Sequence, residues 1–328
     1  MIYIDFPRDI FADNNVLKIW NGGRKSDRGM LIPYLQEHTT IENSLGKDWY
    51  SEAHQEGESV IQVDHYRPKN DAQPVRDMTK SNSPEARFLL TNLENSLGFS
   101  LPQSTDAPNG EYNWLDNACQ NFRLSFTGTN RPKTNFFPIL VGTNRLIDQE
   151  NPWDGDIEYP LLLDPCFKED CGLLEVLEDG TICPAYGPES LPTDFYTDPK
   201  KYWSTNLMKY IRAWTSIYVY RLNHFSFEGA RSLQIKSVIS YLTIGAGLVR
   251  IGKPFPKAAF KAILNLMNAS SRYSLAVRSY MAYHYNPPSN LSSVQIHAMH
   301  TVRDKLIKAI FILEGPHTTF PKPEKLEY

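Results

Sequence analysis

The chain has 328 residues, 41% of them hydrophobic, so it can bury a substantial core and is expected to form one compact body of two subdomains. Its net charge of −3 excludes a protein that coats nucleic acid by bulk electrostatic attraction, so any contact with nucleic acid must be a local patch. The N-terminus lacks a basic-then-apolar signal pattern, and no apolar run looks long enough to cross a bilayer. A cytoplasmic protein with no membrane partner is therefore expected.

The first half of the chain predicts one clear strand framed by loops. Residues 1–46 mix polar and apolar residues and are expected to form an N-terminal segment. A strand is expected to end near Asp64-His65, because Pro68 follows and proline interrupts strand pairing. Residues 70–110 are rich in Pro, Ser and Asn, which predicts a long insertion with a short helix at 83–90. The insertion could form a mobile loop over a substrate groove.

The second half predicts a β-hairpin followed by helices. Two apolar runs within 173–183 flank Glu178-Asp179-Gly180, whose Asp-Gly step favours a hairpin turn. From Tyr202 onward the apolar residues recur at intervals of three and four residues, which predicts a helix. Prolines separate this stretch from helical patterns at 258–285 and 291–313.

Together these elements predict an α+β protein in four parts. The expected boundaries are 1–46 for the N-terminal segment, 47–195 for the first domain, 196–313 for a helical subdomain and 314–328 for a loose or docking tail.

The four cysteines, Cys119, Cys166, Cys171 and Cys183, have spacings that match no standard zinc signature. Reduced thiols are expected, and a remote zinc site built from three of them is the alternative.

Asp64 and His65 suit the hydrolysis of a phosphodiester. A water that attacks phosphorus must lose a proton, and a histidine with an ordinary pKa of about 6.5 is a suitable base. Mg²⁺ can neutralise the developing charge, and Asp64 and Asn130 could hold it, with Asn135 as the alternative to Asn130. Because neighbours on a regular strand point to opposite faces, a kink or a strand end is needed to aim both side chains at one phosphate.

These residues resemble the HNH, or ββα-metal, nuclease family. The family's Asp-His pair, its Asn, and its later Asn with a Lys three residues on match Asp64-His65, Asn121, Asn130 and Lys133. The resemblance implies that His65 is the general base and that Asp64 and Asn130 bind Mg²⁺ or Mn²⁺. Asn121 would brace the loop of the base, and Lys133 would lie near the phosphate.

Four basic residues flank the two halves of this motif and predict a local nucleic-acid-binding patch. They are Arg67, Lys69, Arg123 and Arg131, and scattered surface charge is the alternative.

A narrower resemblance covers residues 47 to about 183. Its further motifs are Trp49-Tyr50-Ser51-Glu52, Tyr112-Asn113-Trp114-Leu115, Asn135-Phe136-Phe137-Pro138 and Pro160-Leu161-Leu162-Leu163-Asp164-Pro165. The set is similar to the HNH subunit of Septu-type and retron-linked anti-phage systems. That likeness implies an ATPase partner of the ABC or SMC-like type.

Many relatives in that family bind a structural zinc with two Cys-x-x-Cys pairs. Asp48 and Ser51 stand at the first pair and Phe126 and Thr129 at the second, so no thiolate cage remains and no structural zinc is expected. Packing of Phe126 with Phe136-Phe137 is the expected substitute.

Two classes of function remain. The first is a metal-dependent endonuclease that cuts DNA, or a structured RNA such as tRNA, in phage defence, with the helical half docking the ATPase. The second is a catalytically inactive scaffold of HNH shape that binds nucleic acid or a partner protein.

Overall fold

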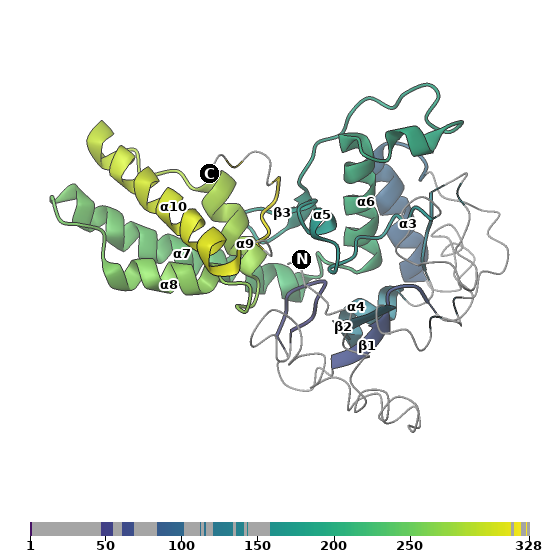
Figure 1. Ribbon diagram of the computed structural model, residues 1–328, viewed down its shortest axis with the longest axis horizontal. Helices are drawn as coiled ribbons and strands as arrows, with labels where there is room; N and C mark the ends of the chain where they lie inside the picture. The colour runs from purple at the N-terminus through teal and green to yellow at the C-terminus, as the bar shows by residue number, and fades with distance from the viewer. Residues whose placement is uncertain are drawn as a thin grey trace.

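A computed structural model of the protein describes residues 47–54, 61–68, 84–101, 121–133, 136–140, 158–315 and 318–322, together with Met1, Tyr112, Leu115, Thr143 and Leu326. Side chains are described throughout these ranges except at 84–90 and Arg131. The expectations for the N-terminal segment, Lys69, Cys119 and Asn135 fall outside the described residues. The described residues form a mixed α+β body from which a helical arm projects (Figure 1).

Two strands and a short helix form one unit of the body. Strand β1 (Ile61–His65) pairs antiparallel with β2 (Phe122–Phe126), and helix α4 (Thr127–Lys133) follows β2 directly. The register is regular, with Asp64 opposite Arg123 and His65 opposite Phe122, so no bulge interrupts the strand. The strand ends at His65, as the sequence predicts.

A second layer of the body is helical. Helix α3 (Pro84–Leu97) lies within the predicted insertion and is longer than the helix expected there. It packs against α6 (Asn206–Val219), where the Tyr210 hydroxyl donates to the Ser96 carbonyl at 3.1 Å. Helix α6 also joins α5 (Lys168–Cys171) through a two-bond ion pair between Arg212 and Asp170. It therefore belongs to the body, and the predicted domain boundary near residue 196 is wrong. A short 3-10 helix (Pro199–Tyr202) precedes it.

The predicted hairpin is present as β3 (Leu174–Val176) and β4 (Ile182–Pro184). Gly180 in its turn has φ +91°, a backbone conformation that residues with a side chain rarely adopt. The Gly180 carbonyl accepts a 2.6 Å hydrogen bond from the buried Arg231 guanidinium of the first arm helix. The hairpin thereby joins the body to the arm.

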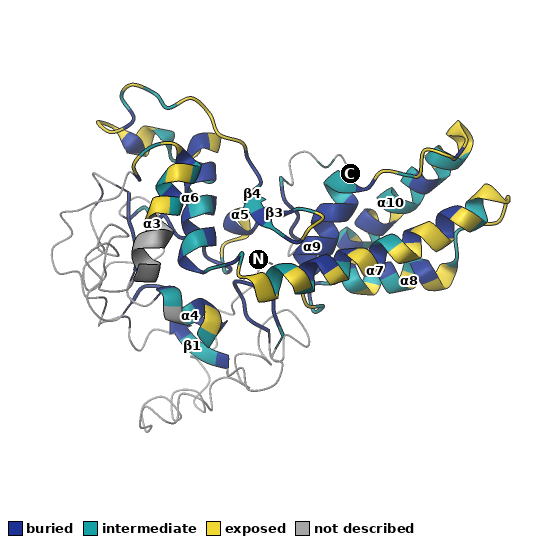
Figure 2. Ribbon diagram, turned by 180° about the vertical axis from the view of Figure 1, so that it is seen from behind, coloured by how far each residue is buried: buried dark blue, intermediate teal, exposed yellow. Residues whose placement is uncertain are grey.

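Three long helices make up the arm: α7 (Phe225–Arg250), α8 (Lys257–Met267) and α10 (Ser293–Glu314). Helix α9 (Ser274–Ser279) and a π-helical turn (Tyr280–His284) lie at the base of the arm. Apolar residues that face one another are buried while the outer faces are exposed (Figure 2). The buried set includes Ile235, Val238, Leu242, Ile263, Met299, Leu306 and Ile310.

The helical pattern predicted at 258–285 is broken in the structure. Helix α8 ends at Met267, and the Asn268 side chain accepts hydrogen bonds from the Ser270 backbone and hydroxyl. Short polar side chains that bond the nearby backbone compete with helix formation. The spacing of apolar residues alone does not predict this interruption.

Helix α7 is also the one described helix that is long and apolar enough to cross a membrane by length and composition. The mean hydropathy of its best window is 1.2, and 39% of that window is buried inside the protein. Core helices pass the same test, and α7 packs against α8, α9 and α10.

The tail is not loose where the structure describes it. Phe320 is 1% exposed, and the Thr319 carbonyl accepts a 2.8 Å hydrogen bond from the buried Arg278 guanidinium. Lys322 forms an ion pair with Glu175 at 2.7 Å. This part of the tail clamps the arm to the hairpin.

Candidate active site

The Asp64 carboxylate is buried and has a donor at each oxygen. Lys133 Nζ donates to Asp64 Oδ1 at 3.0 Å and also to the His65 carbonyl. The Tyr50 hydroxyl donates to Asp64 Oδ2 at 3.0 Å. Burial raises the pKa of Tyr50 well above its ordinary value, so this hydroxyl keeps its proton at neutral pH.

Lys133 does not lie at the surface, where a phosphate could meet it directly. Its side chain is fully buried, and burial lowers its pKa while the Asp64 carboxylate opposes that effect. Helix α4 begins directly after β2 and packs on both strands, so Lys133, on its last turn, reaches the end of β1. The sequence-predicted Asp64 and Lys133 are therefore in direct contact.

Asn121 holds the chain segment that follows β1. Its side-chain oxygen accepts from the Arg67 backbone N–H at 2.7 Å, and its side-chain nitrogen donates to the Arg67 carbonyl at 2.8 Å. The Asn121 carbonyl accepts from Tyr66 N–H at 2.8 Å. These three bonds fix the turn directly after His65.

Asn130 lies on α4 and donates from its side-chain nitrogen to the Gln62 side-chain oxygen at 3.2 Å. Gln62 and Asp64 are two residues apart on β1 and therefore share one face of the strand. His65 is half-buried on the opposite face, with its ring edge-on to the Phe122 ring at 5.0 Å between centroids. Because the register of β1 is regular, no kink aims Asp64 and His65 at one phosphate. Both side chains could reach one phosphate only because the strand ends at His65.

Two of the predicted nucleic-acid-binding arginines are buried in ion pairs. Arg123 is fully buried and makes two bonds to the Asp164 carboxylate, one of them at 2.6 Å. Arg67 is 4% exposed, with its Nε 2.6 Å from Glu158 Oε2. Neither guanidinium reaches the surface, so this part of the prediction is wrong. The Arg131 and Lys69 side chains lie outside the described part of the chain.

The four positions that stand where relatives carry zinc cysteines meet around the Asp48 carboxylate. Asp48 Oδ1 accepts from the backbone N–H groups of Tyr50 and Ser51, at 3.0 and 2.6 Å, and from the Ser51 hydroxyl. Its Oδ2 accepts from Phe126 N–H at 2.6 Å and from the Thr129 hydroxyl. The buried aromatic residues around Phe126 contribute packing, but a hydrogen-bonded carboxylate makes the link between the two turns.

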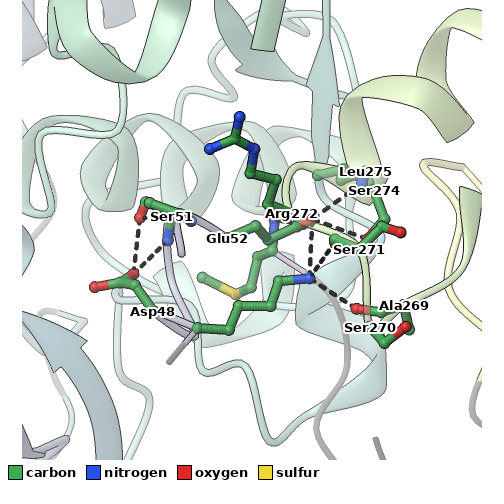
Figure 3. A network of polar contacts seen from close by, with 12 residues as sticks. Asp48, Ser51, Glu52, Ala269, Ser270, Ser271, Arg272, Ser274 and Leu275 are labelled. Carbon is green, nitrogen blue, oxygen red and sulfur yellow. Dashed lines mark hydrogen bonds and ion pairs between the residues drawn. The ribbon is translucent and has the colours of Figure 1, made fainter. Parts of the chain in front are cut away.

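The same segment faces the arm with its other two charged residues (Figure 3). Lys47 Nζ donates to the carbonyls of Ala269 and Ser271, at 2.8 and 2.9 Å. Glu52 accepts from the backbone N–H of Leu275 at 3.0 Å, and the Met1 ammonium lies 2.8 Å from its Oε1. Burial would raise the pKa of Glu52, but the positive charges of Met1 and Lys47 outweigh burial and lower it to about 2.

The donor chemistry at Asp64 fits a hard cation such as Mg²⁺. A carboxylate oxygen of Asp64 and the amide oxygen of Asn130 are the ligand types that Mg²⁺ prefers, with water completing the shell. One feature competes with a metal ion: the Lys133 ammonium already supplies a positive charge to Asp64. Among the described residues, no group of three or more His, Cys, Asp or Glu side chains could hold a metal ion.

Two residues that the sequence does not single out contact the site: Tyr50 bonds to Asp64 and Gln62 to Asn130, while Asp48 holds the adjoining turns together. Tyr50 belongs to the quoted Trp49-Tyr50-Ser51-Glu52 motif, and Gln62 lies two residues before Asp64 on the predicted strand. Strand alternation could have placed Gln62 beside Asp64. The bond from Tyr50 depends on tertiary structure and has no local signal.

No family model, curated protein or solved structure matches the chain.

Proposed function

We propose that the protein is a metal-dependent endonuclease of the HNH, or ββα-metal, type that hydrolyses phosphodiester bonds. The observation that carries this proposal is the β1–β2–α4 unit. It brings the Asp64 carboxylate, the Lys133 ammonium and the His65 backbone into contact, with Asn121 bracing the adjoining turn. Residues separated by up to 69 positions in sequence thus converge at the end of one strand.

Each residue has a distinct role in this proposal. His65 takes the proton from the attacking water, for which a half-buried imidazole is suited because water reaches it. Asn121 keeps the turn after His65 in one conformation. Asp64 and Asn130 would hold Mg²⁺ or Mn²⁺, which would neutralise charge that develops on the phosphate oxygens.

The resemblance to anti-phage HNH subunits extends the proposal to a biological setting. A cytoplasmic defence complex with an ABC or SMC-like ATPase would recruit and restrain the nuclease. DNA is the favoured substrate, and a structured RNA such as tRNA is the second.

The direct test replaces the proposed base. His65→Ala should lower cleavage of labelled DNA or tRNA, with Mg²⁺ or Mn²⁺ present, by about 100-fold or more, as expected for a missing general base. The matched control is His297→Ala, which changes an exposed histidine on the arm and should leave the rate unchanged. Wild-type-like cleavage by His65→Ala protein, with contaminating nuclease excluded, would remove His65 from the mechanism.

One observation favours the second candidate, a catalytically inactive scaffold. The Lys133 ammonium is bonded to the carboxylate that a metal ion would need. A protein that has exchanged its metal for an internal lysine would keep the shape of the site and bind nucleic acid or a partner without cutting. Binding without cleavage under any divalent metal would support this candidate.

A further inference from the structure

The arm is basic while the rest of the chain is acidic. Residues 225–314, all of which the structure describes, contain 11 Lys and Arg and 3 Asp and Glu, for a net charge of +8. The whole chain has 34 basic and 37 acidic residues, so the remainder carries 23 and 34, for a net charge of −11. The overall charge of −3 conceals this separation.

The positive charge of the arm lies on its surface. Eight of the 11 basic side chains are exposed: Lys236, Arg250, Lys253, Lys257, Lys261, Arg272, Lys305 and Lys308. Two of the three acidic residues in this range are in ion pairs: the half-exposed Asp304 carboxylate with Arg303, and Glu314 with the buried Arg278. Arg303 and Arg278 are not among the eight exposed basic residues, so these two ion pairs leave the charge of that set in place.

The lysines follow the helix surfaces. On α8, Lys257, Lys261 and Asn265 are exposed at intervals of four, which places them along one face. On α10, Lys305 and Lys308 are three residues apart and share a face in the same way. Helix α7 has 26 residues, so at about 1.5 Å per residue the arm offers a surface about 39 Å long.

The root of the arm lies against the candidate active site. A Cβ atom at Gly128 of α4 would lie 3.9 Å from the Phe227 ring of α7, so the first turn of the arm contacts the helix that carries Asn130 and Lys133. The basic arm therefore begins beside the helix of the candidate site.

We infer that the arm binds the phosphate backbone of the nucleic acid, without reading its sequence, and so brings the substrate to the site on α4 and β1. This inference rests on the proposed function. Such a surface is needed because the rest of the sequence is acidic and because Arg67 and Arg123 are buried. An anionic membrane is the weaker occupant of the face that carries Lys257 and Lys261, because a membrane-binding helix places apolar residues beside its lysines and the exposed stripe of α8 is polar. Elsewhere the arm does expose apolar side chains, such as Leu233 and Ile244, so phosphatidylserine vesicles are part of the test.

The test uses full-length protein with His65→Ala, so that substrate is not consumed, and a labelled duplex long enough to span the arm. Lys257→Glu with Lys261→Glu should weaken binding about tenfold or more. It should also reduce the slope of log Kd against log salt by about one unit for each phosphate that the variant no longer neutralises. The matched control is Lys168→Glu with Lys200→Glu, which reverses two exposed charges on the body and should leave binding nearly unchanged. Equal melting temperatures would establish that each variant is folded.

Equal binding by the arm and control variants would overturn the inference. So would capture of the protein by phosphatidylserine vesicles with no binding of the duplex. Loss of an ATPase partner from the arm variant, with duplex binding unchanged, would assign the arm to protein docking and overturn the inference as well.

Failure of the inference and failure of the proposed function give different results. Arm-dependent binding by a wild-type protein that cuts nothing with Mg²⁺ or Mn²⁺ supports the inference and contradicts the nuclease. If the wild-type protein cuts nucleic acid but its arm variants bind the duplex normally, the nuclease is supported and the inference about the arm is contradicted.

Discussion

Lys133 and Asp64 are both removed from water and share a hydrogen bond at the end of β1. A buried charge that loses its partner costs several kcal/mol, because neither water nor another ion replaces that partner. The same geometry gives Asp64 two possible counter-charges, the lysine ammonium and a divalent cation. The balance between the two decides whether the site is catalytic.

Lys133→Met should therefore destabilise the metal-free protein by about 3 to 5 kcal/mol, since it leaves the Asp64 carboxylate uncompensated. Added Mn²⁺ should raise the melting temperature of this variant more than that of the wild type, because metal bound only to the folded state stabilises it. Thermal unfolding with and without Mn²⁺ measures both effects. Lys322→Met removes one of the two partners of Glu175 on β3, outside the β1–β2–α4 unit, and should show no added response to Mn²⁺. An equal response in all three proteins would contradict a metal site at Asp64.

The buried Asp48 carboxylate accepts hydrogen bonds from two turns of the chain. Asp48→Ala should lower the free energy of unfolding by about 3 kcal/mol or more, because the backbone N–H groups of Tyr50, Ser51 and Phe126 lose their acceptor in a buried place. Denaturant unfolding measures the change.

The control is Asp304→Ala, which removes a half-exposed carboxylate from α10 and should change stability by about 0.5 kcal/mol or less. A similarly small effect for Asp48→Ala would mean that packing around Phe126 holds the two turns together and that the carboxylate does not.

At the scale of elements, the β3–β4 hairpin depends on how closely it approaches α7. A Cβ atom at Gly180 would lie 2.1 Å from the Glu228 carbonyl oxygen and 2.9 Å from Ser232 N, and φ at this residue is +91°. Gly180→Ala should thus lower the free energy of unfolding by about 2 kcal/mol or more, through a backbone clash and an unfavourable conformation.

Gly187→Ala is the matched control, because nothing lies within 4 Å of a Cβ atom at that position. It should be neutral to within about 0.5 kcal/mol. If both variants unfold at the same denaturant concentration, the hairpin does not pack on α7 as closely as the structure has it.

The segment 47–52 is a further connection between body and arm. Asp48 accepts hydrogen bonds from Phe126 of β2 and Thr129 of α4. Lys47 donates to the chain between α8 and α9, and Glu52 accepts from the first turn of α9. One short segment thereby joins the helix of the candidate site to the base of the arm.

At the scale of the whole molecule, local patterns predicted much of the order of elements. The strand end at His65, the Asp-Gly hairpin and the last helix, expected at 291–313 and found at Ser293–Glu314, all follow from residues close in sequence. Each can be predicted from the residue types of a turn or from the spacing of apolar residues, and both signals extend over only a few residues. The candidate site was assembled from a family pattern, because no local rule brings Lys133 to Asp64.

The wrong predictions share a physical cause. Arg123 pairs with a carboxylate 41 residues away and Arg67 with one 91 residues away, so sequence alone cannot tell these arginines from surface charge. Helix α6 has the same apolar period as the arm helices, and only its contacts with α3 and Asp170 assign it to the body. The tail is held by Arg278 and Glu175, which lie far from it along the chain.

The central claim is that Asp64 and Asn130 form a metal centre beside His65. A crystal of the protein soaked in Mn²⁺ and measured at the manganese absorption edge tests it most directly. One anomalous peak is expected within coordination distance of an oxygen of both side chains, with Lys133 moved away from Asp64. No peak at this position, with the bond between Lys133 and Asp64 intact in the presence of Mn²⁺, would contradict it.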